Sequence, residues 1–158
     1  AHEGSIRIGS KTVMGRDNTI NAYLDITIGD ECVISDSIYM CDFDHRFSDL
    51  DTPIRLQGIT KSPIRIGANV WLGTKVSVLK GSQVGAGSVI GAHSVVRGAV
   101  APMSVAAGIP VRVVRSRLDV GEKQFRVQRH AESVRVRTRD ALNEMSGNGA
   151  SGSTPDSS

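Results

Sequence analysis

The sequence predicts an all-β fold in which short strands coil into a parallel β-helix of six-residue repeats. The first observation is a period, since aliphatic residues recur at Ile66, Leu72, Val78, Val84, Ile90 and Val96. The second is composition: aromatic residues make up only 4% of the chain, so small and β-branched side chains must build the core. A helix would show a period of 3.6 and a strand a period of two, whereas six indicates a strand and a turn that repeat.

The segment 64–96 is expected to form the regular part of the stack. Glycine follows four of the six aliphatic positions, at Gly67, Gly73, Gly85 and Gly91, and permits a tight corner or a close backbone approach. Aliphatic or small residues stand two positions before each, at Ile64, Val70, Val76, Ser82, Ser88 and Ser94. One rung cannot bury its apolar side alone, so the rungs are expected to stack on one another.

The N-terminal half repeats less regularly. Steps of six join Ile8, Met14 and Ile20, and again Ile28, Ile34 and Met40. The step from Ile20 to Ile28 is eight, which indicates two inserted residues near Tyr23 and Leu24. Between Met40 and Ile66 the period vanishes, and the polar segment 42–62 is expected to protrude as a loop. Loops of this length are usually functional or disordered.

The C-terminal part differs in composition from the repeat. We expect a β-helix domain at 1–116 with the loop 42–62 inserted, a basic extension at 117–145 that includes a candidate helix, and a disordered Gly/Ser-rich tail at 146–158. The net charge is +3, and the excess is local, with nine Lys/Arg against four Asp/Glu between Val111 and Asp140, which is interpreted as a solvated tail or a phosphate-contacting end. Nucleic acid is not expected as a partner, because no aromatic residues interleave with these charges. The sequence shows no signal peptide and no apolar run long enough for a membrane span, so a cytoplasmic location is expected.

Several motifs together resemble the hexapeptide-repeat acyltransferases, in particular the galactoside, maltose and polysaccharide O-acetyltransferases. The most specific is the block 63–73, PIRIGANVWLG, and the resemblance continues through Leu79-Lys80-Gly81, 89–92 and 94–96 to 107–115. It covers about residues 5–116. The resemblance implies a left-handed β-helix of triangular section, acetyl-CoA or another acyl-CoA as donor, and a homotrimer with active sites between neighbouring subunits.

His45 is the candidate general base for acyl transfer. Histidine titrates near pH 6.5, so a neutral imidazole is available to take a proton at pH 7. The resemblance places the catalytic histidine of the family at the start of this loop, sixteen residues after an Ile-Gly rung, as His45 follows Gly29. Asp42 or Asp44 is expected to orient the imidazole, as a carboxylate does in a catalytic triad. Many relatives carry a second histidine where this chain has Phe43.

The resemblance also implies contacts to the donor. Trp71, Thr74 and Ala92 match residues along the pantetheine arm, and Thr74 and Ala92 are eighteen residues apart, one full coil. Arg97, Arg112 and Arg115 are the candidates for the nucleotide end, because guanidinium groups bind phosphate in a bidentate manner. No family residues align on the side of the acceptor, a sugar or glycan hydroxyl. By residue type and place in the chain, its candidate contacts are Asn21, Asp25, Asp44 and Gln57.

Two other functions compete with O-acyl transfer. One is a non-catalytic β-helix that serves as a scaffold. The other is a zinc-dependent lyase of the carbonic anhydrase kind, which shares this fold and needs about three protein ligands. The chain has only four histidines, His2, His45, His93 and His130, two of them outside the repeat, so no metal is expected.

Overall fold

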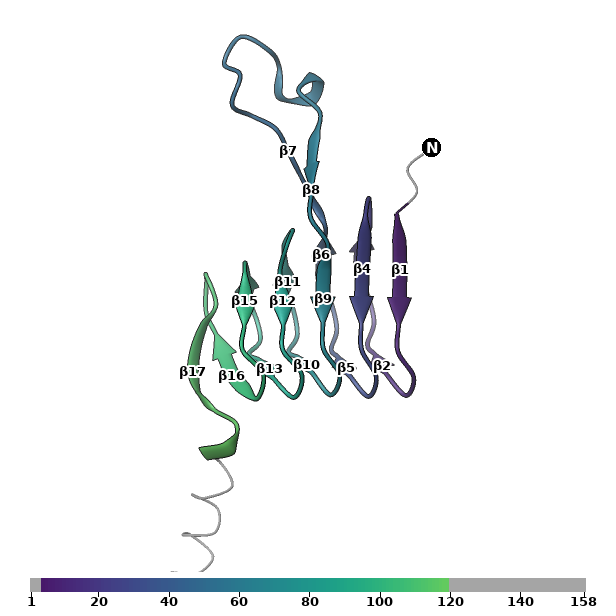
Figure 1. Cartoon of the computed structure of the whole chain (residues 1–158), viewed down its shortest axis with the longest axis vertical. Helices are drawn as coiled ribbons and strands as arrows, with labels where there is room; N and C mark the ends of the chain where they lie inside the picture. The colour runs from purple at the N-terminus through teal and green to yellow at the C-terminus, as the bar shows by residue number, and fades with distance from the viewer. Residues whose placement is uncertain (1–3, 120–158) are drawn as a thin grey trace, which may run out of the picture. The chain divides into compact units, whose positions relative to one another are not determined.

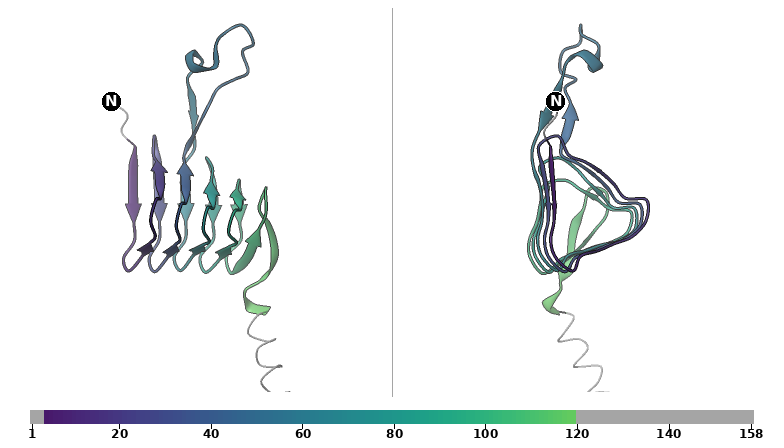
Figure 2. Two further views of the ribbon diagram at one scale, coloured as in Figure 1. Left: turned by 180° about the vertical axis from the view of Figure 1, so that it is seen from behind. Right: turned by 90° about the vertical axis from the view of Figure 1, so that its right-hand side faces the viewer.

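The computed structural model describes residues 4–119 and shows a left-handed parallel β-helix of triangular section (Figures 1 and 2). A compact unit ends at Leu118. Of the predicted extension 117–145, only residues 117–119 are described, and the predicted tail 146–158 lies outside the described residues.

Three parallel sheets form the sides of the prism. Sheet A contains β1 (Ser5–Ile8), β4 (Asp25–Ile28), β9 (Ile64–Ile66), β12 (Gln83–Val84) and β15 (Ala99–Val100). Sheet B contains β2 (Val13–Met14), β5 (Val33–Ile34), β10 (Trp71–Leu72), β13 (Val89–Ile90) and β16 (Ser104–Ala107), and is closed by the antiparallel strand β17 (Arg112–Ser116). Sheet C contains β3 (Thr19–Asn21), β6 (Tyr39–Cys41), β11 (Ser77–Val78) and β14 (Val95–Val96).

The structure confirms that the aliphatic residues of the six-residue period face inward. All six aliphatic positions from Ile66 to Val96 are at most 3% exposed. The strand register stacks each on its counterpart one coil away, as Leu72 pairs with both Ile34 and Ile90. The serines two positions before the last three aliphatic residues are also buried, and the Ser82 hydroxyl donates to the carbonyl of Val96 at 3.0 Å. The hydroxyls of Ser88 and Ser94 also have backbone partners, as buried polar groups require.

The corners of the prism turn through glycine at some positions and through other residues at the rest. Most turn through one residue in the left-handed region, among them Asn69 (φ 55°) and His93 (φ 58°). Asparagine, aspartate and histidine adopt this conformation more readily than most residues. His93 is therefore an exposed corner residue.

The segment 42–62 protrudes from the corner between sheets C and A, as the sequence predicts (Figures 1 and 2). It is more ordered than a plain loop. Strands β7 (Phe43–His45) and β8 (Ile59–Lys61) pair as an antiparallel hairpin, and a short 3₁₀ helix, η1 (Ile54–Leu56), lies between them. The hairpin gives the protrusion a rigid base.

Candidate active site

His45 ends strand β7 and is exposed at the base of the protruding hairpin. In the hairpin register it lies opposite Ile59. The ring of Phe43 meets the imidazole edge-on, with 6.2 Å between centroids and an interplanar angle of 81°. The imidazole is thus open to an incoming substrate while one of its sides contacts an aromatic ring.

The two aspartates expected to orient the imidazole have other partners in the structure. Asp42 is fully buried, and its carboxylate accepts backbone N–H bonds from Tyr23, Leu24 and Asp25. Asp44 faces the other side of β7, where its carboxylate lies 3.2 Å from the ammonium group of Lys80. A direct carboxylate–imidazole contact, expected by analogy with a catalytic triad, is replaced here by ring packing.

The residues predicted to contact the pantetheine lie on sheet B and on the corner between sheets B and C. Trp71 projects outward from β10, is 50% exposed, and donates its indole N–H to the hydroxyl of Ser35 at 3.2 Å. Thr74 follows β10 and Ala92 follows β13, strands that pair in a register of eighteen residues. The N–H of His93 donates to the carbonyl of Thr74 at 2.9 Å, so the two corners stack directly. The structure brings these three residues onto one edge of the prism.

The predicted phosphate contacts lie at the C-terminal end of the stack. Arg112 and Arg115 are exposed on β17, and Arg97 is exposed where the chain leaves β14. The N–H of Val111 donates to the carbonyl of Val95 at 2.9 Å, which brings the start of β17 beside β14. All three guanidinium groups are therefore presented by the last coils.

The predicted acceptor residues fall into different settings. Asn21 ends β3 beside Cys41, at the corner that adjoins the hairpin. Asp25 begins β4, and its carboxylate binds Arg7 at 2.7 Å and Arg65 at 2.6 Å. The amide of Gln57 donates to the carbonyls of Asp49 and Thr52, both at 2.7 Å, and accepts from the N–H of Asp49. Asp25 and Gln57 thus organise the outward face of sheet A and the tip of the loop.

The phenol of Tyr39 lies close to the corner that adjoins the hairpin, and its pKa is shifted. The pKa of Tyr39 is raised, first by its hydrogen bond with Cys41 and then by burial. Residues missed by the sequence reasoning gather in the same region, namely Tyr23, Tyr39, Lys61 and Lys80. The two-residue insertion near Tyr23 was the signal that something distinct lies at this corner.

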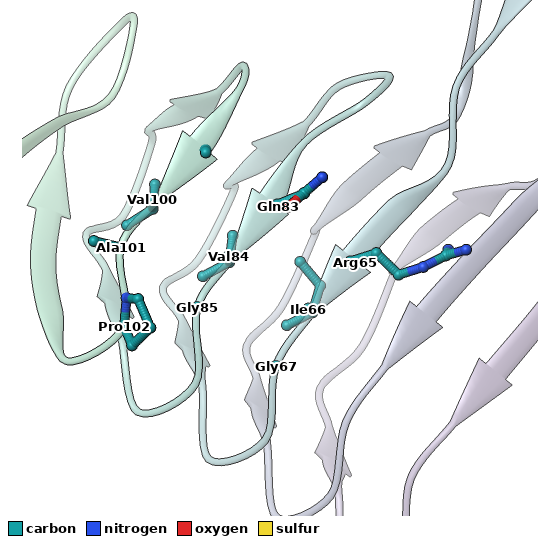
Figure 3. A pocket seen from close by; sticks show the side chains of 10 residues that line it. Arg65, Ile66, Gly67, Gln83, Val84, Gly85, Val100, Ala101 and Pro102 are labelled. Carbon is teal, nitrogen blue, oxygen red and sulfur yellow. The ribbon is translucent and has the colours of Figure 1, made fainter.

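Hollows on the described part of the surface adjoin Trp71, the loop and sheet A. A hollow of 220 Å³ adjoins Trp71 and is also lined by Glu31, Asn69 and Arg117. One of 350 Å³ lies inside the loop, between Arg46 and Gln57. Another, of 690 Å³, follows sheet A, where Arg65 and Gln83 project away from Ile66, Val84 and Val100 (Figure 3). Arg117 donates a hydrogen bond to the carbonyl of Gly87 at 2.8 Å. This arginine is a candidate contact to the acyl-CoA donor that the sequence alone did not indicate.

Among residues 4–119, no three His, Cys, Asp or Glu side chains are grouped to hold a metal ion. His2 and His130 lie outside these residues. Within that range, too, no helix has the length and apolar character that crossing a membrane requires.

One chain does not bring the predicted base and the predicted donor contacts together. The hairpin with His45 leaves the corner between sheets C and A, because it connects β6 to β9. Trp71, Thr74 and Ala92 lie on sheet B and at the corner between sheets B and C. The two sets therefore occupy different edges of the triangular prism, and Figure 2 shows the hairpin rising from one of them.

Comparison with known proteins identifies the repeat. Residues 63–98 match the family model described as bacterial transferase hexapeptide (six repeats). The chain is 57% identical over 117 residues to a probable acetyltransferase of Mycobacterium tuberculosis, covering 74% of this chain and 39% of the relative. It is 35% identical over 116 residues to galactoside O-acetyltransferase of Escherichia coli, covering 73% of this chain and 56% of the relative.

Solved structures agree with these sequence relatives. A hexapeptide-repeat acetyltransferase of Vibrio cholerae, determined in complex with acetyl coenzyme A, is 35% identical and superimposes with a TM-score of 0.65, over 70% of this chain and 60% of that one. The chain therefore spans between about two fifths and three fifths of the length of these relatives.

Proposed function

The chain belongs to the hexapeptide-repeat acyltransferases, and from this premise we propose that it transfers an acetyl group from acetyl-CoA to a hydroxyl of a sugar or glycan. The observation that carries the proposal is the edge formed by Trp71, Thr74 and Ala92. Stacked corners one coil apart give a straight, extended surface, which suits the long pantetheine arm. A relative of this fold was solved with acetyl coenzyme A bound.

His45 is the proposed general base. Its neutral imidazole takes the proton of the acceptor hydroxyl as the oxygen attacks the thioester carbonyl. The tetrahedral intermediate collapses, the bond from carbon to sulfur breaks, and the departing thiolate of coenzyme A takes up the proton from the imidazolium. The exposure of His45 at the hairpin base supports this role, because both substrates must reach it.

A second copy of the chain is proposed to complete each site. His45 and the donor edge lie on different edges of one prism, so the hairpin of one copy would serve the donor edge of its neighbour. Sheet B supports this arrangement with outward apolar residues, among them Val13 (64% exposed), Val33 (46%) and Trp71 (50%). Sheet A instead presents Arg7, Asp25 and Arg65 outward. A homotrimer packed through sheet B would cover the apolar row.

The acceptor is proposed to bind beside the hairpin base. Asp44 precedes His45 in β7, Asn21 lies opposite Cys41 just before that strand, and amide and carboxylate groups suit sugar hydroxyls. Asp25 and Gln57 remain proposed acceptor contacts, with the ion pairs and loop hydrogen bonds described above as their present partners. Galactoside O-acetyltransferase among the relatives favours a sugar as the acceptor class.

The experiment that tests the function is thiol release from acetyl-CoA against a panel of sugars. His45→Ala is expected to lower kcat by at least about a hundredfold, because general base catalysis contributes that much. Calorimetric binding of coenzyme A is expected to persist in this variant, since the donor edge is unchanged. Gln83→Ala, on the outward face of sheet A, is the matched control and is expected to keep both properties.

Two results would contradict the proposal. Near-normal turnover by His45→Ala would remove this residue from the mechanism. A folded protein that neither binds coenzyme A nor releases thiol would favour a non-catalytic scaffold instead.

A further inference from the structure

The corner at residues 22–24 is built differently from its counterparts in later coils. Between sheets C and A, those coils turn through glycines in the left-handed region, Gly81 (φ 75°) and Gly98 (φ 94°). The corner at 22–24 carries the two-residue insertion that interrupts the period. It curls around the carboxylate of Asp42, which belongs to the next coil.

Asp42 holds three pieces of chain together. One carboxylate oxygen accepts from the N–H of Tyr23 at 2.7 Å, and the other accepts from Leu24 at 2.8 Å and Asp25 at 2.7 Å. Its own N–H donates to the carbonyl of Asn21, and its carbonyl accepts from the N–H of Ser62 at 2.9 Å. One fully buried residue therefore joins the inserted corner, the entry of the hairpin and its exit. Hydrogen bonds to a carboxylate are strong, so this junction is rigid.

The inserted corner places an aromatic ring under the hairpin. Tyr23 packs on Phe43 with ring centroids 4.3 Å apart and planes tilted by 48°. Phe43 in turn meets the His45 imidazole edge-on. Lys61 lies on β8, the other strand of the hairpin, and its ammonium group is 5.8 Å from the centroid of the Tyr23 ring. Contacts thus run without a break from Asp42 through Tyr23 and Phe43 to the imidazole.

We infer that Asp42 and the Tyr23–Phe43 ring pair are positioning residues that fix the orientation of the His45 imidazole. The inference rests on the proposed role of His45 as general base. Edge-to-face packing restricts the rotation of the imidazole, and a displacement of about 1 Å at a reacting group can lower a rate about a hundredfold. The carboxylate acts through the backbone of the corner and the two rings, and touches neither substrate nor imidazole.

The variant Asp42→Asn tests whether the carboxylate is needed, because asparagine has nearly the same size as aspartate. Asparagine offers one acceptor oxygen, and its NH₂ group must face at least one N–H donor. The less costly orientation keeps the bonds to Leu24 and Asp25 and turns the NH₂ group toward Tyr23. We expect kcat to fall about tenfold or more while KM for acetyl-CoA changes less than about twofold.

Asp30→Asn is the matched control for this substitution. The Asp30 carboxylate also accepts a backbone N–H, that of Ser10 at 2.6 Å, but at the corner between sheets A and B. The same chemical change there is expected to leave kcat at the wild-type value. The oxygen of asparagine can keep this bond, so Asp30→Asn shows the effect of losing the charge of a corner carboxylate, whereas a positioning role lowers kcat only in Asp42→Asn.

Phe43 variants test the ring. Phe43→Leu removes the aromatic edge and is expected to lower kcat about tenfold, again with KM for acetyl-CoA unchanged. Phe43→Tyr keeps the ring and is expected to restore turnover. Equal activity of the leucine and tyrosine variants, both near wild type, would overturn the inference.

A spectroscopic measurement separates this inference from the proposed function. The imidazole proton resonance of His45, identified by its loss in His45→Ala, is expected to carry a ring-current shift from Phe43. That shift should vanish in Phe43→Leu, decrease in Asp42→Asn and persist in Asp30→Asn. An unchanged resonance in Phe43→Leu and Asp42→Asn would overturn the positioning role. Full turnover by His45→Ala would instead refute the general base, while the ring-current shift would still report whether the imidazole is held.

Discussion

Asp25 lies between two arginines and a serine on the outward face of sheet A. Its pKa is lowered, first because the Ser5 hydroxyl donates to the carboxylate at 2.6 Å, and then because Arg65 and Arg7 favour the charged form. Residues 18 and 40 positions away supply these partners. The side chain therefore links three successive coils.

The free energy of unfolding should depend on pH through Asp25. A carboxyl group whose pKa is lowered by folding stabilises the protein above its unfolded pKa, about 3.9, and this contribution is lost as the pH falls through the folded pKa. Asp25→Asn is therefore expected to destabilise the protein at about pH 6 and to approach the wild type at about pH 3, measured by urea unfolding. Asp17→Asn, at an exposed corner, should change the free energy by at most about 0.5 kcal/mol. An equal effect of Asp25→Asn at both pH values would contradict the assignment.

The coil is the element that repeats, and its contribution to the stability of the protein depends on its place in the stack. Central coils have neighbours on both sides, so Ile90 is fully buried. In the first coil, Ile8 occupies the equivalent kind of inward position but is 47% exposed, because among the described residues a coil packs on it from one side only. Stability in such a stack is nearly a sum of neighbour interactions.

Replacing isoleucine with alanine should lower the free energy of unfolding by different amounts in a central coil and in the first coil. Ile90→Ala leaves a cavity in a close-packed interior and is expected to lower the free energy of unfolding by about 3 kcal/mol. Ile8→Ala should cost about 1 kcal/mol, because half of that side chain is already in water. Chemical denaturation of both variants measures the difference. Equal losses would mean that the first coil is packed as tightly as the centre.

At the scale of the whole molecule, the outward faces of the prism differ in character. Sheet A carries charged and amide side chains, whereas sheet B carries the apolar row that includes Val13, Val33 and Trp71. An apolar row on one side of a prism is typical of an interface between copies. The separation of His45 from the donor edge within one chain also favours an interface between copies.

A charge within this row should disrupt the proposed trimer. Val33→Glu is expected to sediment as a single chain of 16.8 kDa, whereas the wild type should sediment at about three times that mass. Thiol release should fall with assembly, since each proposed site needs two copies. Gln83→Glu adds the same charge on sheet A and should leave the mass unchanged. A trimeric Val33→Glu protein would place the interface elsewhere.

The sequence by itself determined the β-helix, its inward residues, the position of the insertion and the protrusion of 42–62. It could do so because each rung packs on its own counterpart a fixed number of residues away, so the periodic pattern encodes the tertiary contacts. The resemblance to a family then gave the candidate base and donor contacts.

Only the tertiary structure decided which partners the non-periodic residues have. Asp42 was a candidate for orienting His45 directly, yet it is buried against the backbone of Tyr23, Leu24 and Asp25. Asp25 pairs with arginines of two other coils. These contacts depend on how an inserted corner and a protruding hairpin turn in space. No period in the sequence records that geometry, because such contacts occur once and not in every coil.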